Sequence, residues 1–93
     1  MLLQRAEDIE RLKPAATTQI ESSRAEPGCL EYTYAVDLLE PSKIRVTERW
    51  TSWAALEAHF KMPHMAVWRE ALRDLEIVAR HLKAHEVKDS RTI

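Results

Sequence analysis

Residues 23–32 read SRAEPGCLEY, and this stretch decides how the first half of the chain folds. Before it, apolar residues recur at three- and four-residue steps from 6 to 23, which predicts an amphipathic helix. Pro14 lies inside that helix, so we expect either a kink there or a first regular turn that begins near it. The run Glu26, Pro27 and Gly28 then stops the helix, because proline removes an amide donor and glycine permits a turn. The last residues of the stretch begin a strand.

Two strands follow the turn. Large side chains alternate with smaller or polar ones between residues 29 and 36 and again between 43 and 50, which is the period of half-buried strands. Pro41 lies in the loop between them, so the strands are predicted to pair as a long hairpin. The residues expected to point inward are Leu30, Tyr32, Tyr34 and Val36 on the first strand, and Ile44, Val46, Glu48 and Trp50 on the second.

The second half of the chain predicts two helices and a last strand. Ser52 is a suitable N-cap because its hydroxyl can accept a free amide of the first turn, and residues 53–60 are rich in helix formers. Pro63 suits the first position of another helix, whose apolar stripe continues to about residue 74. Residues 77–87 give a weaker strand pattern, and residues 88–93 form a polar tail.

The order of these elements is that of an α+β, ferredoxin-like βαββαβ fold with an antiparallel sheet. Its first strand is truncated or very short, because only Met1 to Gln4 precede the first helix. A longer first strand would need upstream residues or another chain segment. We expect one domain over residues 1–93, with a core from about 6 to 87.

The composition excludes several classes of partner. The 93 residues carry a formal net charge of −1 with no basic stripe, so neither nucleic acid nor an acidic membrane surface is expected to bind. Because no apolar run approaches about 18 residues, and the N-terminal one is too short for a signal peptide, we expect a soluble, cytoplasmic protein. The single cysteine, Cys29, fits a reducing compartment.

The chain resembles the antibiotic biosynthesis monooxygenase domain family of small dimeric α+β barrels. The resemblance covers about residues 6–87 and is carried by RAEPGCLEY at 24–32, ERW at 48–50, and ALEAHF at 55–60 followed by Pro63 and His64. It implies a homodimer in which two sheets meet face to face, with a separate pocket in each subunit between sheet and helices.

Three residues are candidates for catalysis: His59, His64 and Glu48. The histidines flank a helix break at Met62 and Pro63, where side chains can turn into a cavity, and an imidazole can accept a proton at neutral pH. Glu48 shares a strand face with apolar residues, so burial would favour a general base. For each residue a purely structural role, as a cap or a paired carboxylate, stays open.

Aromatic and sulfur side chains supply candidate walls for a flat ligand. The predicted substrate-binding residues are Tyr32, Tyr34, Trp50, Phe60, Met65 and Trp68. One of the two tyrosine hydroxyls is expected to bind Glu48 or the ligand, because a buried phenol needs a partner. Trp53 is expected to be more exposed.

No metal site is expected. No cysteine or acidic third ligand stands at a recognisable spacing from His59 and His64, and His81 and His85 would lie about 13 Å apart on a strand, at the surface. Haem-degrading members of the family have a tryptophan in place of His59 and an iron-binding histidine near Trp68, so haem breakdown is disfavoured. The asparagine that many oxygenase members carry on the first strand has no counterpart here.

The leading hypothesis is a cofactor-independent monooxygenase that acts on a small aromatic or quinol substrate. A histidine, with Glu48, would ionise the substrate, whose anion would reduce dioxygen directly in an apolar pocket. Two alternatives stay open: an isomerase or tautomerase of a small enolisable carbonyl compound, and a dimer that binds a small ligand without catalysis.

Overall fold

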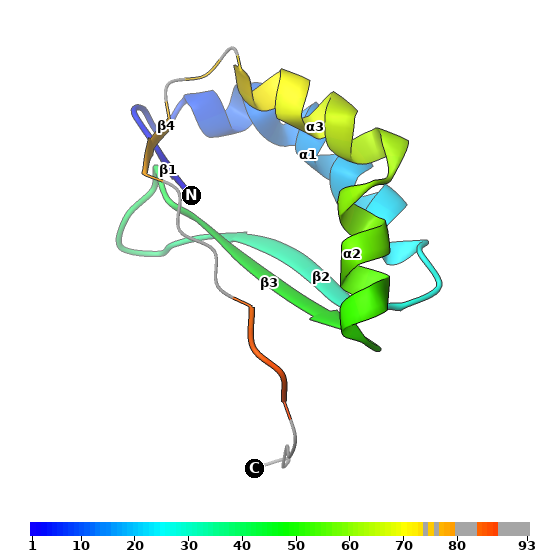
Figure 1. Ribbon diagram of the computed structural model, residues 1–93. Coiled ribbons are helices and arrows are strands. Elements are labelled where there is room, and N and C mark those ends of the chain that lie inside the picture. Colours follow the sequence, from blue (N-terminus) through cyan, green and yellow to red (C-terminus); the bar gives the residue numbers. More distant parts are fainter. Residues whose placement is uncertain (74, 76, 80–83, 88–93) are drawn as a thin grey trace.

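A computed structural model of the chain describes residues 1–73, 75, 77–79 and 84–87 (Figure 1). The elements follow the predicted βαββαβ order, with the second helical segment split in two. In chain order they are β1 (Leu2–Leu3), α1 (Asp8–Arg24), β2 (Cys29–Val36), β3 (Ile44–Trp50), α2 (Trp53–Phe60), α3 (Pro63–Arg73) and β4 (Ile77–Ala79).

Two antiparallel strand pairs form the sheet of this ferredoxin-like α+β fold. Strand β2 pairs with β3 as the predicted hairpin, and β1 pairs with β4. Each pair is a two-stranded sheet, and an isolated antiparallel bridge between Leu2 of β1 and Lys43, just before β3, connects the two. Strand β1 has only two residues, as the short N-terminal segment predicted.

Helices α1 and α3 lie side by side over one face of the hairpin, and α2 stands across its end (Figure 1). Helix α1 begins at Asp8 and passes through Pro14. The core lies between these two helices and strands β1 and β3, and its buried members are Leu3, Ile9, Leu12, Ile44, Trp68 and Leu72. The opposite face of the hairpin carries no helix in the described part of the chain.

Local signals located the starts of α2 and α3 correctly. The Ser52 hydroxyl accepts a hydrogen bond from the amide of Ala55 at 3.1 Å, which confirms the predicted N-cap of α2. Pro63 is the first residue of α3, also as predicted. Gly28 allows β2 to start close against α2, because a Cβ at this position would lie 2.4 Å from the Cβ of Ala55.

The ends of the strands differ from the sequence pattern. Leu30 is 57% exposed and Val36 is 50% exposed, although both were expected to point inward. The register shifts between Cys29 and Glu31, which turns Leu30 out of the alternation. The last strand is also shorter than predicted: β4 ends at Ala79, residues 84–87 are not in a strand, and residues 80–83 lie outside the described residues.

Within the described residues, no helix combines the length and the apolar character needed to cross a bilayer.

Candidate active site

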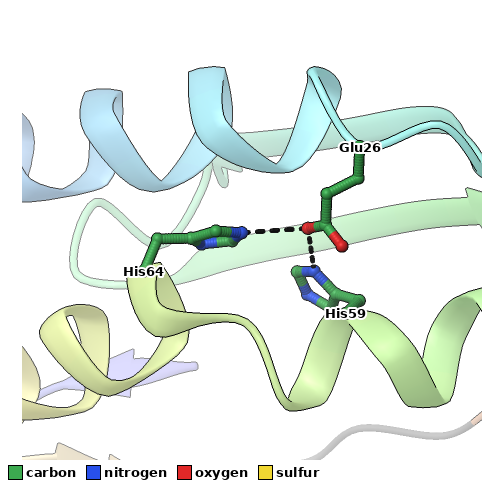
Figure 2. A group of neighbouring side chains, drawn as sticks. All are labelled: Glu26, His59 and His64. Atoms are coloured by element: carbon green, nitrogen blue, oxygen red, sulfur yellow. Dashed lines mark hydrogen bonds and ion pairs between the residues drawn. The ribbon is translucent and has the colours of Figure 1, made fainter.

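Three segments that are distant in sequence bring one carboxylate and two imidazoles into contact (Figure 2). Glu26 lies in the turn after α1, His59 in the last turn of α2, and His64 at the start of α3. Oxygen Oε2 of Glu26 lies 2.6 Å from Nδ1 of His59 and 2.9 Å from Nε2 of His64. The side chains of Glu26 and His59 are 7% and 1% exposed, and that of His64 is 13% exposed. The carboxylate therefore bridges both imidazoles in a nearly dry environment.

On the side of α1, a hydrogen-bonded chain extends from this cluster to two tyrosines. Oε1 of Gln19 lies 2.8 Å from Nδ1 of His64, and Nε2 of Gln19 donates to the Tyr32 hydroxyl at 2.9 Å. The Tyr32 and Tyr34 hydroxyls lie 3.0 Å apart. Nε2 of Gln19 also lies 2.9 Å from the sulfur of Met65. Gln19 and Tyr32 are fully buried, so this chain belongs to the interior.

On the side of β3, Glu48 and Trp50 lie next to His59. The indole of Trp50 donates to Oε1 of Glu48 at 3.1 Å, and its ring centroid is 4.6 Å from that of His59. The same Glu48 oxygen is 3.9 Å from Nε2 of His59. Nε2 of His59 is buried and has no hydrogen-bond partner among the described residues. This nitrogen can therefore gain a contact when His59 takes up a proton, because Glu48 faces it.

A groove of about 530 Å³ opens beside the cluster, between the end of α1, the start of β2 and helix α2. Its walls are mainly apolar, and Glu26 is the charged residue among those that line it. The remaining residues that line it are Ser22, Ala25, Pro27, Gly28, Trp50, Thr51, Ala55, Ala58 and Met62. The second oxygen of Glu26 carries no bond to either imidazole (Figure 2). Glu26 thus joins the groove to the imidazole pair.

The structure brings the three predicted catalytic residues together: Glu48 lies 3.9 Å from Nε2 of His59, and the ring centroid of His64 lies 5.6 Å from that of His59. The predicted ligand-binding residues are scattered. Trp50 lines the groove, whereas Trp68 is buried in the core against Tyr34, and Phe60 is 49% exposed. Trp53 is 49% exposed, as expected.

Tyr32, Tyr34 and Met65 meet on the Gln19 side of the cluster. We expected a tyrosine hydroxyl to bind Glu48 or a ligand, but the Tyr32 hydroxyl contacts Gln19 and Tyr34, and Glu48 accepts its bond from Trp50.

Glu26 and Gln19 are the two residues of this cluster that the sequence argument missed. Glu26 was taken only as part of the helix stop. A signal for Gln19 existed, because an amide at this position falls on the buried face of α1, seven residues after Leu12. Of the remaining histidines, His85 is exposed and His81 lies outside the described residues.

Glu26, His59 and His64 are also residue types that can bind a divalent cation, and their donor atoms lie within 4.8 Å of one another. The spacing argument against a metal site therefore overlooked a possible acidic third ligand, Glu26. Two ligands of a tetrahedral ion with ordinary bond lengths would lie roughly 3.3 Å apart. The observed separations of 2.6 and 2.9 Å between the Glu26 oxygen and the two nitrogens are those of direct hydrogen bonds.

The carboxylates of this region also act on Cys29, at the start of β2. Burial raises the pKa of the Cys29 thiol, and the carboxylates of Glu26 and Glu48 raise it further. A thiol with a raised pKa is a poor nucleophile at neutral pH, so Cys29 is not a candidate for covalent catalysis.

Known proteins share both the sequence pattern and the fold. The family model of the antibiotic biosynthesis monooxygenases matches residues 4–71. The uncharacterised protein sll1783 of Synechocystis sp. is 33% identical over 76 residues, which are 82% of this chain and 52% of that protein. The chain therefore spans about half the length of this curated relative.

Two solved structures show the same architecture. A candidate antibiotic biosynthesis monooxygenase from Deinococcus radiodurans is 27% identical, and the match covers 99% of this chain and 91% of that one with a TM-score of 0.89. Rv0793 from Mycobacterium tuberculosis shares the fold at 22% identity, with a TM-score of 0.76 over 95% of this chain and 92% of its own. By its sequence match over residues 4–71, this chain belongs to the antibiotic biosynthesis monooxygenase family.

Proposed function

We propose that this protein is a cofactor-independent monooxygenase that oxidises a small, electron-rich phenol or quinol. The observation that carries the proposal is the position of Glu26. One of its carboxylate oxygens accepts bonds at 2.6 and 2.9 Å from two imidazoles, and Glu26 is also one of the residues that line an apolar groove of about 530 Å³. A ligand in the groove therefore meets a base that is already connected to two groups able to hold protons.

The walls of the groove favour a particular class of ligand. Trp50, Met62 and several alanines offer apolar surface, while Glu26 is the charged group among them. A flat aromatic ring with one hydroxyl group matches this set, because the ring buries apolar area and the hydroxyl donates to the carboxylate. An anionic ligand would be repelled by the same carboxylate.

The reaction begins with ionisation of the bound hydroxyl. Its proton passes to Glu26, whose carboxylate is held in place by the bonds from His59 and His64 at 2.6 and 2.9 Å. Glu48, 3.9 Å from the other side of His59, stabilises positive charge on that ring. The apolar walls of the groove reduce the contact of the resulting anion with water.

The phenolate then supplies the electrons that dioxygen needs. It transfers one electron to dioxygen, and the radical pair combines at the ring carbon opposite the hydroxyl to form a peroxide. That carbon next loses its proton while the O–O bond breaks. For 1-naphthol, the products are 1,4-naphthoquinone and one water: one oxygen atom of dioxygen becomes the new carbonyl, and the other leaves in the water. The substrate provides all four electrons, so the balance requires no further reductant.

We propose further that the working form is a cytoplasmic homodimer. The hairpin face opposite the helices carries Thr33, Ala35, Arg45, Thr47 and Arg49, all of them exposed. A second copy placed against this face would cover it and leave one groove in each subunit. A small domain also gains stability from the area that such contact buries. The lone Cys29 suits a reducing compartment, where no disulfide is needed.

Oxygen consumption and product analysis with a panel of naphthols and hydroquinones test the proposal. We expect turnover that needs dioxygen but no added metal or flavin, and a decrease of at least about 10²-fold in E26Q, the size of a general-base contribution. Proton exchange from deuterated water into an enolisable ketone without oxygen uptake would favour the isomerase. Ligand binding with no turnover in any assay would favour a binding protein.

A further inference from the structure

The amide group of Gln19 contacts three different partners in the interior. One end of the amide lies 2.8 Å from Nδ1 of His64, and the other lies 2.9 Å from both the Tyr32 hydroxyl and the sulfur of Met65. The two ends of an amide have opposite roles, since the oxygen only accepts hydrogen bonds and the nitrogen only donates them. The orientation of this amide therefore decides which hydrogens its partners must carry.

Met65 distinguishes the two orientations. A thioether sulfur is a weak acceptor, so an amide N–H suits a position 2.9 Å from it. The amide oxygen in that position would place two lone-pair-bearing atoms in repulsive contact. Tyr32 does not discriminate in the same way, because its hydroxyl can donate or accept. Met65 thus fixes the nitrogen of Gln19 toward itself and the oxygen toward His64.

This orientation determines the protonation of His64. Nδ1 of His64 faces the oxygen of Gln19, and its Nε2 faces a carboxylate oxygen of Glu26 at 2.9 Å. Both neighbours are acceptors, so each ring nitrogen must carry a hydrogen to make its bond. We infer that His64 is held as an imidazolium in the resting protein, with Gln19 as its positioning residue and Met65 as the contact that locks the amide.

The charges around the ring agree with this assignment. His64 meets Gln19 from α1, Glu26 from the turn after α1, and the ring of His59 from α2 at a centroid distance of 5.6 Å. The carboxylate of Glu48 is the next acidic group, beyond His59. Two carboxylates thus surround the histidine pair, and one imidazolium offsets part of their charge in a buried site.

The protonation of His64 does not depend on the proposed function, but the catalytic roles that follow from it do. An imidazolium has no free lone pair, so His64 cannot be the base that ionises the substrate. Its charge instead stabilises the carboxylate of Glu26, which leaves Glu26 and His59 to accept the proton. The chain of donors is also fixed in direction: Gln19 donates to Tyr32, whose own hydrogen is then available to Tyr34.

Nitrogen-15 NMR of the imidazole rings tests the inference without any substrate, and four histidines give few signals to assign. At pH 7, both ring nitrogens of His64 should show the shifts of an imidazolium. M65L should lose one of these ring protons, because the amide can then turn over. M62L, at a methionine that does not contact Gln19, should retain both.

Q19E preserves an acceptor toward His64 and should also retain both ring protons. A wild-type spectrum with one bare nitrogen on His64 would overturn the inference, whether or not any variant folds. An M65L spectrum identical to that of the wild type would overturn the role of Met65. Neither result depends on turnover, so failure here is distinguishable from failure of the proposed oxygenase.

Discussion

Oε2 of Glu26 lies 2.6 Å from Nδ1 of His59, although 33 residues separate them in the sequence. This contact holds the turn between α1 and β2 against the last turn of α2. The bond from His64 to the same oxygen connects the start of α3 to that turn as well. The cluster therefore acts on both stability and chemistry. It closes the end of the fold where the groove opens, and in the proposed mechanism it provides the base that acts on a ligand there.

Replacing Glu26 should weaken the fold more than replacing Glu48. E26Q replaces the charged oxygen that both imidazoles share with a neutral amide, which weakens two buried bonds, so we expect a loss of about 1–3 kcal/mol in the free energy of unfolding. For a domain of this size each kcal/mol lowers the melting temperature by roughly 4–8 °C. E48Q is the control, because its side chain is 22% exposed and keeps an acceptor for Trp50. Equal stability of E26Q and wild type in urea denaturation would rule out this role.

G28A should destabilise the protein through a steric conflict. A methyl group at position 28 would lie 2.4 Å from the Cβ of Ala55, which is fixed to the backbone of α2 and cannot rotate away. We expect a cost of about 1–3 kcal/mol, which is typical of overpacking. Restoring space with A55G in the same chain should recover part of the loss. If G28A alone unfolds at the wild-type urea concentration, β2 and α2 are not in such close contact.

S52A removes the N-cap of α2 and should cost about 1 kcal/mol. The lost bond is the one from the amide of Ala55 to the Ser52 hydroxyl at 3.1 Å. S52D can accept the same bond and should stay close to wild type, which separates the cap from a general effect of substitution at this surface position. The measurement is thermal unfolding followed by circular dichroism. A melting temperature of S52A that matches S52D would contradict the prediction.

The Cys29 thiol should react slowly with iodoacetamide at neutral pH and faster as the pH rises. Burial first, and then the charges of Glu26 and Glu48, raise the pKa of this thiol, so the reactive thiolate is scarce below that pKa. E26Q and E48Q each remove one negative charge and should increase the alkylation rate at pH 8. A rate in both variants that equals the wild-type rate would show that these carboxylates do not act on Cys29.

The sequence was sufficient for the parts of the fold that depend on near neighbours. The strand of residues 29–36, the cap at Ser52 and the helix start at Pro63 follow from alternation, capping and proline geometry, and the structure confirms them. The exposure of Leu30 could not be predicted from such local patterns. It results from a register shift between paired strands, and a register shift leaves no trace in the alternation of one strand.

In the candidate site, too, some residues could be predicted from local sequence and others could not. His59, His64 and Glu48 were predicted from their positions near a helix break and on a strand face, and they do lie near one another. Glu26 was missed because its partners are 33 and 38 residues away, and its local sequence already had an explanation as a helix stop. Spacing rules for ligands or bases cannot find a residue that only the tertiary fold brings into contact.

Oxidation of 1-naphthol and its hydroxylated analogues under ¹⁸O₂ tests the central claim most directly. The claim is that Glu26, bonded to two imidazoles at the edge of an apolar groove, ionises a phenol so that it reacts with dioxygen. We expect wild-type protein, stripped of metals by a chelator, to form quinone that carries one ¹⁸O atom, and E26Q to form it at least about 10²-fold more slowly. Quinone without the label, equal rates for the two proteins, or no oxidation of any member of the series would contradict the account.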